Sequence, residues 1–283
     1  MERKKTGLTI IELLIVLGII ALLVGLLLPA VSAVKKMAKE TKQKAQFATI
    51  ELALEAFKND YGDYPPSDRF LLPPHPSSIN YCGSQRLAEA LLGWDLLGFH
   101  PNSAWREDGL DATGGPGTYD PAQTRDINGD GVPDTFDERK GPYLELANVG
   151  AFRLLDLFGT NIVFLDPNTY VICDVFGAKK ISMANGKIVR AGAPILYYRA
   201  DTSGKMIRTI YNRRDNLFLI TTMQNADHSR DHPLTSPIYF YDYIKNPKIT
   251  ARDWPYRPDS YILISAGADG LYGTPDDITN FGN

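Results

Sequence analysis

Hydrophobic residues are most concentrated in one run close to the N-terminus of the sequence. Between Leu8 and Val34 the chain contains a single ionisable side chain, Glu12. A helix needs about 20 apolar residues to cross a bilayer, and this run is long enough to do so. The pattern therefore predicts one membrane-competent helix, followed by a chain of ordinary mixed polarity.

A second helical pattern follows directly. No glycine or proline interrupts residues 31–60, and residues that favour helices dominate this stretch. Apolar residues recur in it at helical spacing: Phe47, Ile50, Leu54, Phe57 and, one turn on, Tyr61. We expect this stripe to pack against a sheet as part of an ordinary core. Pro29 lies in the first stretch and is expected to kink or locally melt the helix near the membrane exit.

The remaining chain shows mainly strand signals. Residues 85–97 predict a short amphipathic helix, and residues 144–157 are ambiguous. β-Branched and aromatic runs predict strands at residues 170–176, 187–189, 195–199 and 261–265. Asn185-Gly186 predicts a hairpin turn. The predicted fold class is α+β: a long N-terminal helix, transmembrane and then amphipathic, packed on a C-terminal antiparallel β-sheet with large loop insertions.

Composition and charge narrow the classes of protein. The 283 residues include 44% hydrophobic and 22% charged residues, which is typical of a folded chain and excludes a disordered one. The formal net charge of −3 predicts no nucleic-acid partner. Two cysteines, Cys82 and Cys173, are too few for a disulfide scaffold, and either one disulfide or two buried thiols fits the sequence.

The residues before the hydrophobic run are basic. Three basic residues stand against one acid within residues 2–5. The positive-inside rule therefore leaves them in the cytoplasm and the bulk of the chain on the far side. A secretory signal peptide, cleaved near residues 31–33, is the alternative. The run exceeds the usual signal-peptide core of about 7–15 residues, and a signal peptide has no use for Glu12.

These residues carry a family resemblance. The segment Gly7-Leu8-Thr9-Ile10-Ile11-Glu12, between a basic leader and a long apolar helix, resembles the N-terminal signature of type IV prepilins. Within that group the chain most resembles type II secretion system major pseudopilins, with an enlarged head domain. The resemblance implies that a prepilin peptidase cleaves after Gly7 and methylates the new amino terminus at Leu8. Leu8 departs from the phenylalanine that is usual in the family.

The resemblance also gives two residues of the helix a role in assembly. Glu12 and Pro29 become the fifth and twenty-second residues of the mature chain, as in the family. The new N-terminal ammonium group and the carboxylate of Glu12 can neutralise each other between neighbouring subunits in the membrane. This pairing would set the register of an otherwise apolar helix bundle.

A domain layout and a set of partners follow from the same resemblance. Residues 1–7 form a cleaved leader, 8–30 a transmembrane and assembly helix, 31–60 its amphipathic continuation, and 61–283 an extracytoplasmic head. The implied partners are prepilin peptidase, other pilin or pseudopilin subunits, an inner-membrane assembly platform and membrane lipid. The chain is expected to cross the inner membrane once, with its N-terminus in the cytoplasm, and then to enter a periplasmic or surface filament.

Two acidic loops are candidate sites for Ca²⁺, the expected cofactor. The first loop places oxygen ligands at positions 1, 3, 5, 9 and 12 of a calcium loop, with glycine at position 6. These ligands are Asp126, Asn128, Asp130, Asp134 and Asp137. The run resembles dockerin and thrombospondin-type calcium loops. An unliganded acidic surface loop is the alternative.

The second acidic loop, residues 265–278, resembles the terminal calcium loop of major pseudopilins. The resemblance implies Asp269, Asp276 and Asp277 as ligands, and a solvated turn capped by side-chain hydrogen bonds is the alternative. His228 and His232 are also spaced for a metal on a helix. The proline that follows favours a solvated polar loop there instead.

The sequence thus predicts a structural subunit of a type II secretion pseudopilus or a type IV pilus-like filament, and no enzyme. No P-loop, GxGxxG or GxSxG motif occurs. Two alternatives stay open: a membrane-tethered calcium-dependent binding module that does not polymerise, and a tethered enzyme. The long middle region, residues 67–250, leaves open whether the chain is a principal or a minor subunit.

Overall fold

The computed structural model describes residues 9–68, 81–106, 109, 118–119, 134–146, 149–177, 179–182, 186–227 and 230–282. The chain divides into two compact units, residues 1–41 and 42–283. We refer to the second unit as the head. The expected cleavage site at Gly7 and Leu8 lies outside the described residues.

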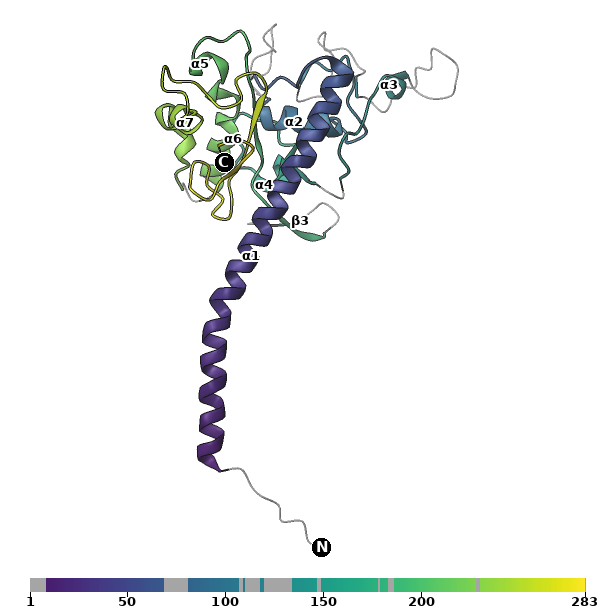
Figure 1. The fold of residues 1–283 in the computed structure, drawn as a ribbon. Coiled ribbons are helices and arrows are strands. Elements are labelled where there is room, and N and C mark those ends of the chain that lie inside the picture. Colours follow the sequence, from purple (N-terminus) through teal and green to yellow (C-terminus); the bar gives the residue numbers. More distant parts are fainter. Residues whose placement is uncertain are drawn as a thin grey trace. The chain divides into compact units, whose positions relative to one another are not determined.

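One helix, α1 (Ile10–Tyr61), contributes to both units (Figure 1). Its 52 residues confirm the long N-terminal helix that the sequence predicts. Of the two effects expected of Pro29, local melting is wrong, because the helix runs through this residue without a break, whereas a kink stays a prediction. A proline removes its own N–H donor and its ring crowds the carbonyl four residues earlier, but the helix formers Leu26–Leu28 and Ala30 beside it hold the neighbouring turns.

The head adds short helices and short strands to the last part of α1 (Figure 1). Its helices are α2 (Gly83–Leu92), α3 (Asp134–Asp137), α4 (Leu154–Phe158), α5 (Ile207–Ile210), α6 (Leu217–Ala226) and α7 (Pro237–Tyr243), with 3₁₀ turns at Arg213–Asp215 and Pro233–Thr235. Its strands are β1 (Gly150–Arg153), β2 (Tyr170–Cys173), β3 (Lys179–Ser182), β4 (Ile188–Ala191), β5 (Leu196–Arg199), β6 (Tyr261–Ser265) and β7 (Ile278–Thr279).

Within the described residues, the strands form three small antiparallel sheets where the sequence predicts a single one. β1 pairs with β2, β3 pairs with β4, and β5, β6 and β7 form the third sheet in that order. The predicted hairpin is confirmed by the pairing of Ser182 with Ile188, although residues 183–185 of its turn lie outside the described part. The α+β class is confirmed.

The three-stranded sheet is buried on both faces. On β6, Tyr261 and Leu263 belong to the core that contains the buried face of α1. Ile262 and Ile264 alternate with them and belong to a second core with α6 and α7. Successive side chains of a strand point to opposite faces, so a strand covered on both sides reads as a continuous apolar run. This explains why the sequence predicts both ends of β6 correctly.

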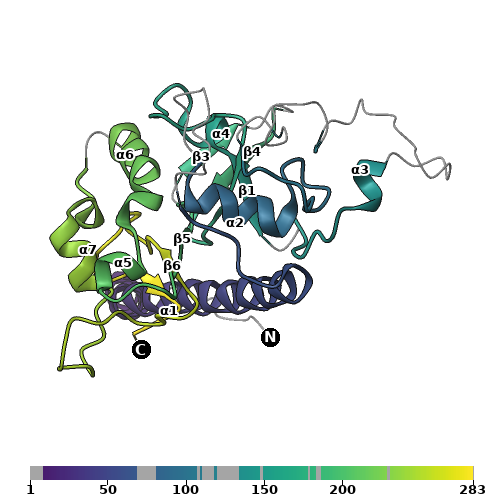
Figure 2. The same ribbon diagram turned by 90° about the horizontal axis from the view of Figure 1, so that it is seen from above.

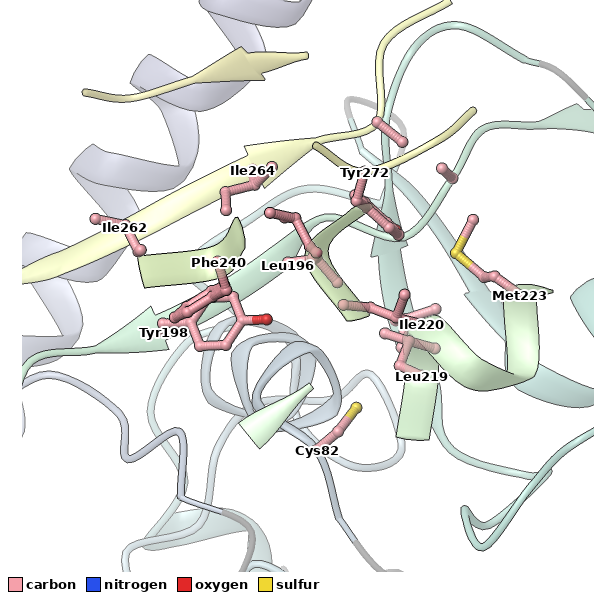
Figure 3. Packing of buried hydrophobic residues seen from close by; sticks show 14 of the residues in the cluster. Cys82, Leu196, Tyr198, Leu219, Ile220, Met223, Phe240, Ile262, Ile264 and Tyr272 are labelled. Atoms are coloured by element: carbon pink, nitrogen blue, oxygen red, sulfur yellow. The ribbon is translucent and has the colours of Figure 1, made fainter. Parts of the chain in front are cut away.

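The second core joins this sheet to the helices that the sequence did not predict (Figure 3). Tyr198 of β5 and Phe240 of α7 pack with their ring centroids 5.1 Å apart. Leu219 and Ile220 of α6 are fully buried in the same cluster. Figure 2 shows α6 and α7 on one side of β5 and α2 on the other. Helices therefore cover both faces of β5.

The predicted stripe on α1 is confirmed as core. Phe47, Ile50, Leu54 and Phe57 are all buried in the head. Gln43 and Gln46 lie on the same buried face. Gln46 Nε2 donates to the carbonyl of Cys173 at 3.0 Å, and Gln43 Oε1 accepts the N–H of Val175 at 3.0 Å. The two glutamines therefore satisfy backbone groups where β2 ends.

Two further expectations are resolved by local structure. The predicted helix 85–97 ends at Leu92, because Gly93 has φ +92° and a Cβ there would lie 2.3 Å from the carbonyl oxygen of Gly98. Cys82 and Cys173 are both free and buried. Of the two alternatives for the cysteines, the structure therefore has two unpaired thiols.

Candidate assembly helix and C-terminal loop

The first candidate site is the apolar part of α1. Within the described residues, α1 is the one helix long and apolar enough to cross a membrane, and none of its most apolar window is buried in the protein. Its large side chains are widely exposed, from Ile10 at 79% to Leu28 at 67%. This surface far exceeds the few hundred Å² of contiguous apolar area that a soluble monomer exposes. It therefore requires lipid or other protein chains as its environment.

Glu12 is placed in the first turn of this helix. Its Oε2 atom accepts two hydrogen bonds from Thr9, one from the N–H and one from the hydroxyl, each 2.8 Å long. The N–H of Glu12 donates in return to Thr9 Oγ1 at 3.3 Å. This reciprocal arrangement is a helix N-terminal capping box. It fixes the carboxylate beside the start of α1, with its Oε2 oxygen taking both of these bonds.

The second candidate site is the loop between β6 and β7. Gly267 has φ +65°, and a Cβ at this position would lie 2.2 Å from the carbonyl oxygen of Asp276. Only glycine tolerates this conformation and this approach. The loop therefore folds back on itself and brings Asp276 against its own beginning. Asp276 Oδ2 accepts the N–H groups of Ala268 and Asp269 at 2.7 and 3.0 Å.

Three oxygen atoms gather around the hydroxyl of Thr274. Thr274 Oγ1 lies 2.7 Å from Asp276 Oδ1, 3.4 Å from Asp277 Oδ1 and 3.2 Å from the carbonyl oxygen of Leu271. A hydroxyl has only one hydrogen to donate, so it cannot satisfy three acceptors. The resulting cluster of hard oxygens matches the donor type that Ca²⁺ prefers.

Asp269 takes a different position in the loop. Its Oδ1 atom accepts the N–H of Leu271 at 2.8 Å, so this carboxylate is used by a local turn. Among the described residues, no three acidic, histidine or cysteine side chains are grouped closely enough to hold a metal together. A calcium ion at Asp276 and Asp277 would therefore need hydroxyl, carbonyl or water oxygens as its other ligands.

The two neighbouring carboxylates differ in their electrostatic environment. Burial raises the pKa of Asp277 to about 7, although Gly273 N–H and the Tyr243 hydroxyl donate to its Oδ2 at 2.7 and 2.9 Å. Burial also acts on Asp276, but hydrogen bonds from Thr274 and from two backbone N–H groups outweigh it and lower its pKa. The fold therefore favours the charged form of Asp276 and the protonated form of Asp277.

The loop is held by side chains whose contacts with it the sequence did not predict. His232 Nδ1 accepts the N–H of Tyr272 at 3.1 Å, and the Tyr239 hydroxyl donates to the carbonyl of Gly273 at 2.8 Å. His232 is 1% exposed, so the expectation of a solvated polar loop is wrong at this position. Its histidine neighbour, His228, lies outside the described residues. Pro233 is the one residue whose type indicates the local structure in the sequence, because a proline favours the start of a helical turn and here begins a 3₁₀ turn.

The first predicted calcium loop is mostly outside the described residues. Asp126, Asn128 and Asp130 are not described, and Asp134 and Asp137 are the first and last residues of α3. The side chain of Asp137 is exposed. Calcium binding by this loop stays a prediction.

Proteins similar to this chain include two named type II secretion system core protein G. The chain is 31% identical over 84 residues to the one from Vibrio cholerae, which covers 28% of this chain and 58% of that protein. It is 25% identical over 146 residues to the one from Dickeya chrysanthemi, which covers 49% of this chain and 86% of that protein. The match thus spans just over half the length of the Vibrio protein.

No family model and no solved structure matches the chain. The similarity to core protein G agrees with the signature at Gly7–Glu12, with the exposed apolar helix and with the α+β head. The chain is therefore pseudopilin-like in both sequence and architecture.

Proposed function

We propose that this protein is a structural subunit of a type II secretion pseudopilus or of a closely related pilus-like filament. The observation that carries the proposal is the first half of α1, which exposes an unbroken apolar surface with Glu12 as its only ionisable residue. In the membrane this surface contacts lipid, and in a filament it contacts the same helix of other subunits. The proteins similar to the chain carry the name of a type II secretion component.

The proposal includes maturation by a prepilin peptidase. Cleavage after Gly7 removes the basic leader and creates an amino terminus at Leu8, which the same enzyme methylates. The other partners are pseudopilin subunits, the inner-membrane assembly platform and membrane lipid. The chain crosses the inner membrane once, with its N-terminus in the cytoplasm and its head outside it. On assembly it becomes part of a periplasmic or surface filament.

Glu12 has a specific task in this proposal. A charged carboxylate at the membrane is costly unless it is paired. Its hydrogen bonds with Thr9 hold it at the helix start, where the free ammonium group of a neighbouring subunit can approach. A role as a structural subunit needs no catalytic residues, and we propose no enzymatic activity for the head.

We also propose that the C-terminal loop binds Ca²⁺ through Asp276 and Asp277, with oxygens of Thr274 and Leu271 completing part of the shell. The crowded oxygens around Thr274 support this site. Asp269 remains a candidate ligand on the family resemblance alone. A bound cation would offset the repulsion between the two adjacent carboxylates and tie the loop to β6 and β7.

The maturation step is tested by determining the N-terminus of the protein extracted from membranes. We expect a chain that begins at Leu8 and carries one added methyl group. A chain that begins at Met1, or near residue 34, would contradict maturation by prepilin peptidase. Recovery of the protein in sheared surface or periplasmic filaments distinguishes a filament subunit from a tethered calcium-dependent module, which would stay with the membrane.

A further inference from the structure

The apolar part of α1 ends in a dense group of lysines. No ionisable residue lies between Glu12 and Lys35, and five lysines then follow within ten residues, accompanied by one acid, Glu40. We call these five residues the lysine collar: Lys35, Lys36, Lys39, Lys42 and Lys44. All five side chains are exposed. The segment from Lys35 to Lys44 therefore carries a formal charge of +4.

The helix gives the collar a defined geometry. Because α1 is continuous here, residues follow one another at about 100° around the axis and 1.5 Å along it. Lys35, Lys39 and Lys42 therefore fall on one side of the helix, over an axial distance of about 10 Å. Lys36 pairs with Glu40 at 3.9 Å, but both side chains are widely exposed, at 59% and 41%. The formal charge of +4 already counts Glu40, so this pair leaves four net positive charges in the segment.

The collar lies at the depth of lipid headgroups when α1 spans a membrane. Starting from Ile10, about 20 residues of helix cross the roughly 30 Å of hydrocarbon. The headgroup layer beyond it takes about 5–7 Å, or some four residues more. Lys35 and Lys36 thus emerge where phosphate groups are found. Their long stems can follow the apolar helix while the ammonium groups reach the phosphates.

Membrane topology does not account for these charges. The positive-inside rule favours basic residues on the cytoplasmic side. In the orientation proposed above, the collar lies on the opposite side and carries more positive charge than residues 2–5, where three basic residues face one acid. The collar therefore works against this orientation, and a binding role is the more direct explanation for it.

We propose that the lysine collar binds the phosphate groups of anionic phospholipids in the membrane leaflet that faces the head. This inference rests on the proposed insertion of α1 in the membrane. Each lysine near an anionic surface strengthens binding by about 1 kcal/mol, or roughly fivefold. Several such lysines on one helix select anionic over neutral lipid around α1. The collar then holds the membrane exit of the helix at a fixed depth before assembly.

The test measures which lipids stay bound to the full chain. The protein is purified in mild detergent with equal amounts of phosphatidylglycerol and phosphatidylcholine, and the bound lipids are quantified by mass spectrometry. We expect phosphatidylglycerol to be enriched severalfold around the unsubstituted chain. Lys35→Gln, Lys36→Gln and Lys39→Gln together should bring the ratio close to that supplied, and the three Lys→Arg substitutions should restore it.

A matched control removes three exposed lysines of the head, Lys180, Lys205 and Lys248, by substitution with glutamine. This control should leave the lipid ratio unchanged. All variants have the same residues before the collar, whether or not the basic leader has been cleaved, so the contribution of the N-terminus cancels. An equal lipid ratio in the collar variant and the unsubstituted chain would overturn the proposal. If that variant instead lost only cross-links to other copies, the collar would be a protein-binding surface, which also overturns it.

The lipid ratio does not depend on filament formation, so it separates this inference from the proposed function. A chain that forms sheared filaments but shows no lipid preference contradicts the inference alone. A chain that prefers phosphatidylglycerol but never enters filaments contradicts the proposed function alone.

Discussion

His232 illustrates how a single buried residue organises the C-terminal loop. Its ring packs against that of Tyr272, with centroids 5.4 Å apart, and its Nδ1 atom accepts the N–H of the same residue. Only an unprotonated Nδ1 can accept this bond. Burial lowers the pKa of His232 to about 4. The folded protein therefore holds this histidine neutral.

This environment predicts a specific pH dependence. The unfolded chain protonates His232 near pH 6.5, whereas the folded chain does so only near pH 4. The unfolded state thus binds more protons between these values, and acid destabilises the fold in this window. We expect the difference in free energy of unfolding between the unsubstituted protein and His232→Gln to shrink by about 3 kcal/mol as the pH falls from 6.5 to 4.

The comparison with the variant is necessary because Asp277 and Asp215 act in the opposite direction. Burial raises the pKa of each to about 7. The folded protein therefore binds these protons more tightly than the unfolded chain, and their contribution to the free energy of unfolding is lost as the pH rises from about 4 to 7. Both carboxylates are present in both proteins and cancel in the difference. Denaturant titrations across the pH range would measure it. A difference that stays constant with pH would show that His232 is not held neutral by the fold.

At the scale of the element, α1 carries two kinds of apolar surface, one in its first part and one in its last turns. Residues up to about 34 are apolar all round and exposed, whereas the last turns bury one face only. The sequence separates these two patterns clearly, because an all-round apolar helix and a one-sided stripe differ in periodicity. The polar members of the buried face, Gln43 and Gln46, were not predictable, because their role depends on backbone groups distant in sequence.

The one-sided stripe predicts unequal effects at two nearby leucines. Leu54 is fully buried, whereas Leu52 is 73% exposed on the same helix. In a soluble head beginning at Ala33, Leu54→Ala should lower the free energy of unfolding by about 2–5 kcal/mol, because it leaves a cavity in a packed core. Leu52→Ala should change it by less than about 0.5 kcal/mol. Equal effects in denaturant unfolding would mean that α1 does not pack on the head as described.

The shorter elements show where sequence patterns do not predict the structure. The strands β2, β4, β5 and β6 were found because each carries a β-branched or aromatic run. The helices α6 and α7 were not, because their threonines and aromatic residues favour strands and only packing on β5 and β6 makes them helical. Ser236-Pro237 was a usable signal, since Ser236 caps α7 and Pro237 takes its first position.

At the scale of the whole molecule, the C-terminal loop connects the sheet to the segment that carries His232 and α7. The sequence identified the loop but not its supports, because Tyr239, Tyr243 and His232 reach it only in the folded head. Arg257 Nη1 pairs with Glu51 of α1 at 2.6 Å, and Asn280 Nδ2 donates to the same carboxylate at 3.0 Å. The end of the chain is thereby tied to the helix within the head.

Calcium should therefore stabilise the head as a whole. A ligand that binds only the folded state at 100 times its dissociation constant adds about 2.7 kcal/mol. For a head of this size we expect the melting temperature to rise by roughly 5–10 °C with calcium relative to chelator. Asp276→Asn with Asp277→Asn should reduce the rise, whereas Asp259→Asn, an exposed aspartate near the same end of the chain, should not.

Two further variants separate the candidate ligands. If Asp269 is a ligand of the C-terminal site, Asp269→Asn should reduce the calcium-dependent rise in melting temperature. If the first loop also binds calcium, Asp126→Asn with Asp130→Asn should remove a part of the same rise. No change in melting temperature at millimolar calcium, together with no bound calcium by elemental analysis, would exclude both sites.

The central claim is that α1 assembles this protein into a filament through Glu12. The most direct measurement is the fraction of the protein recovered in sheared, pelleted filaments from cells that express only one version of the chain. We expect the unsubstituted protein in this fraction. Glu12→Leu should remain in the membrane with a folded head, because removing a membrane charge favours insertion and leaves the head untouched. Recovery of Glu12→Leu in filaments at the unsubstituted level would contradict the account.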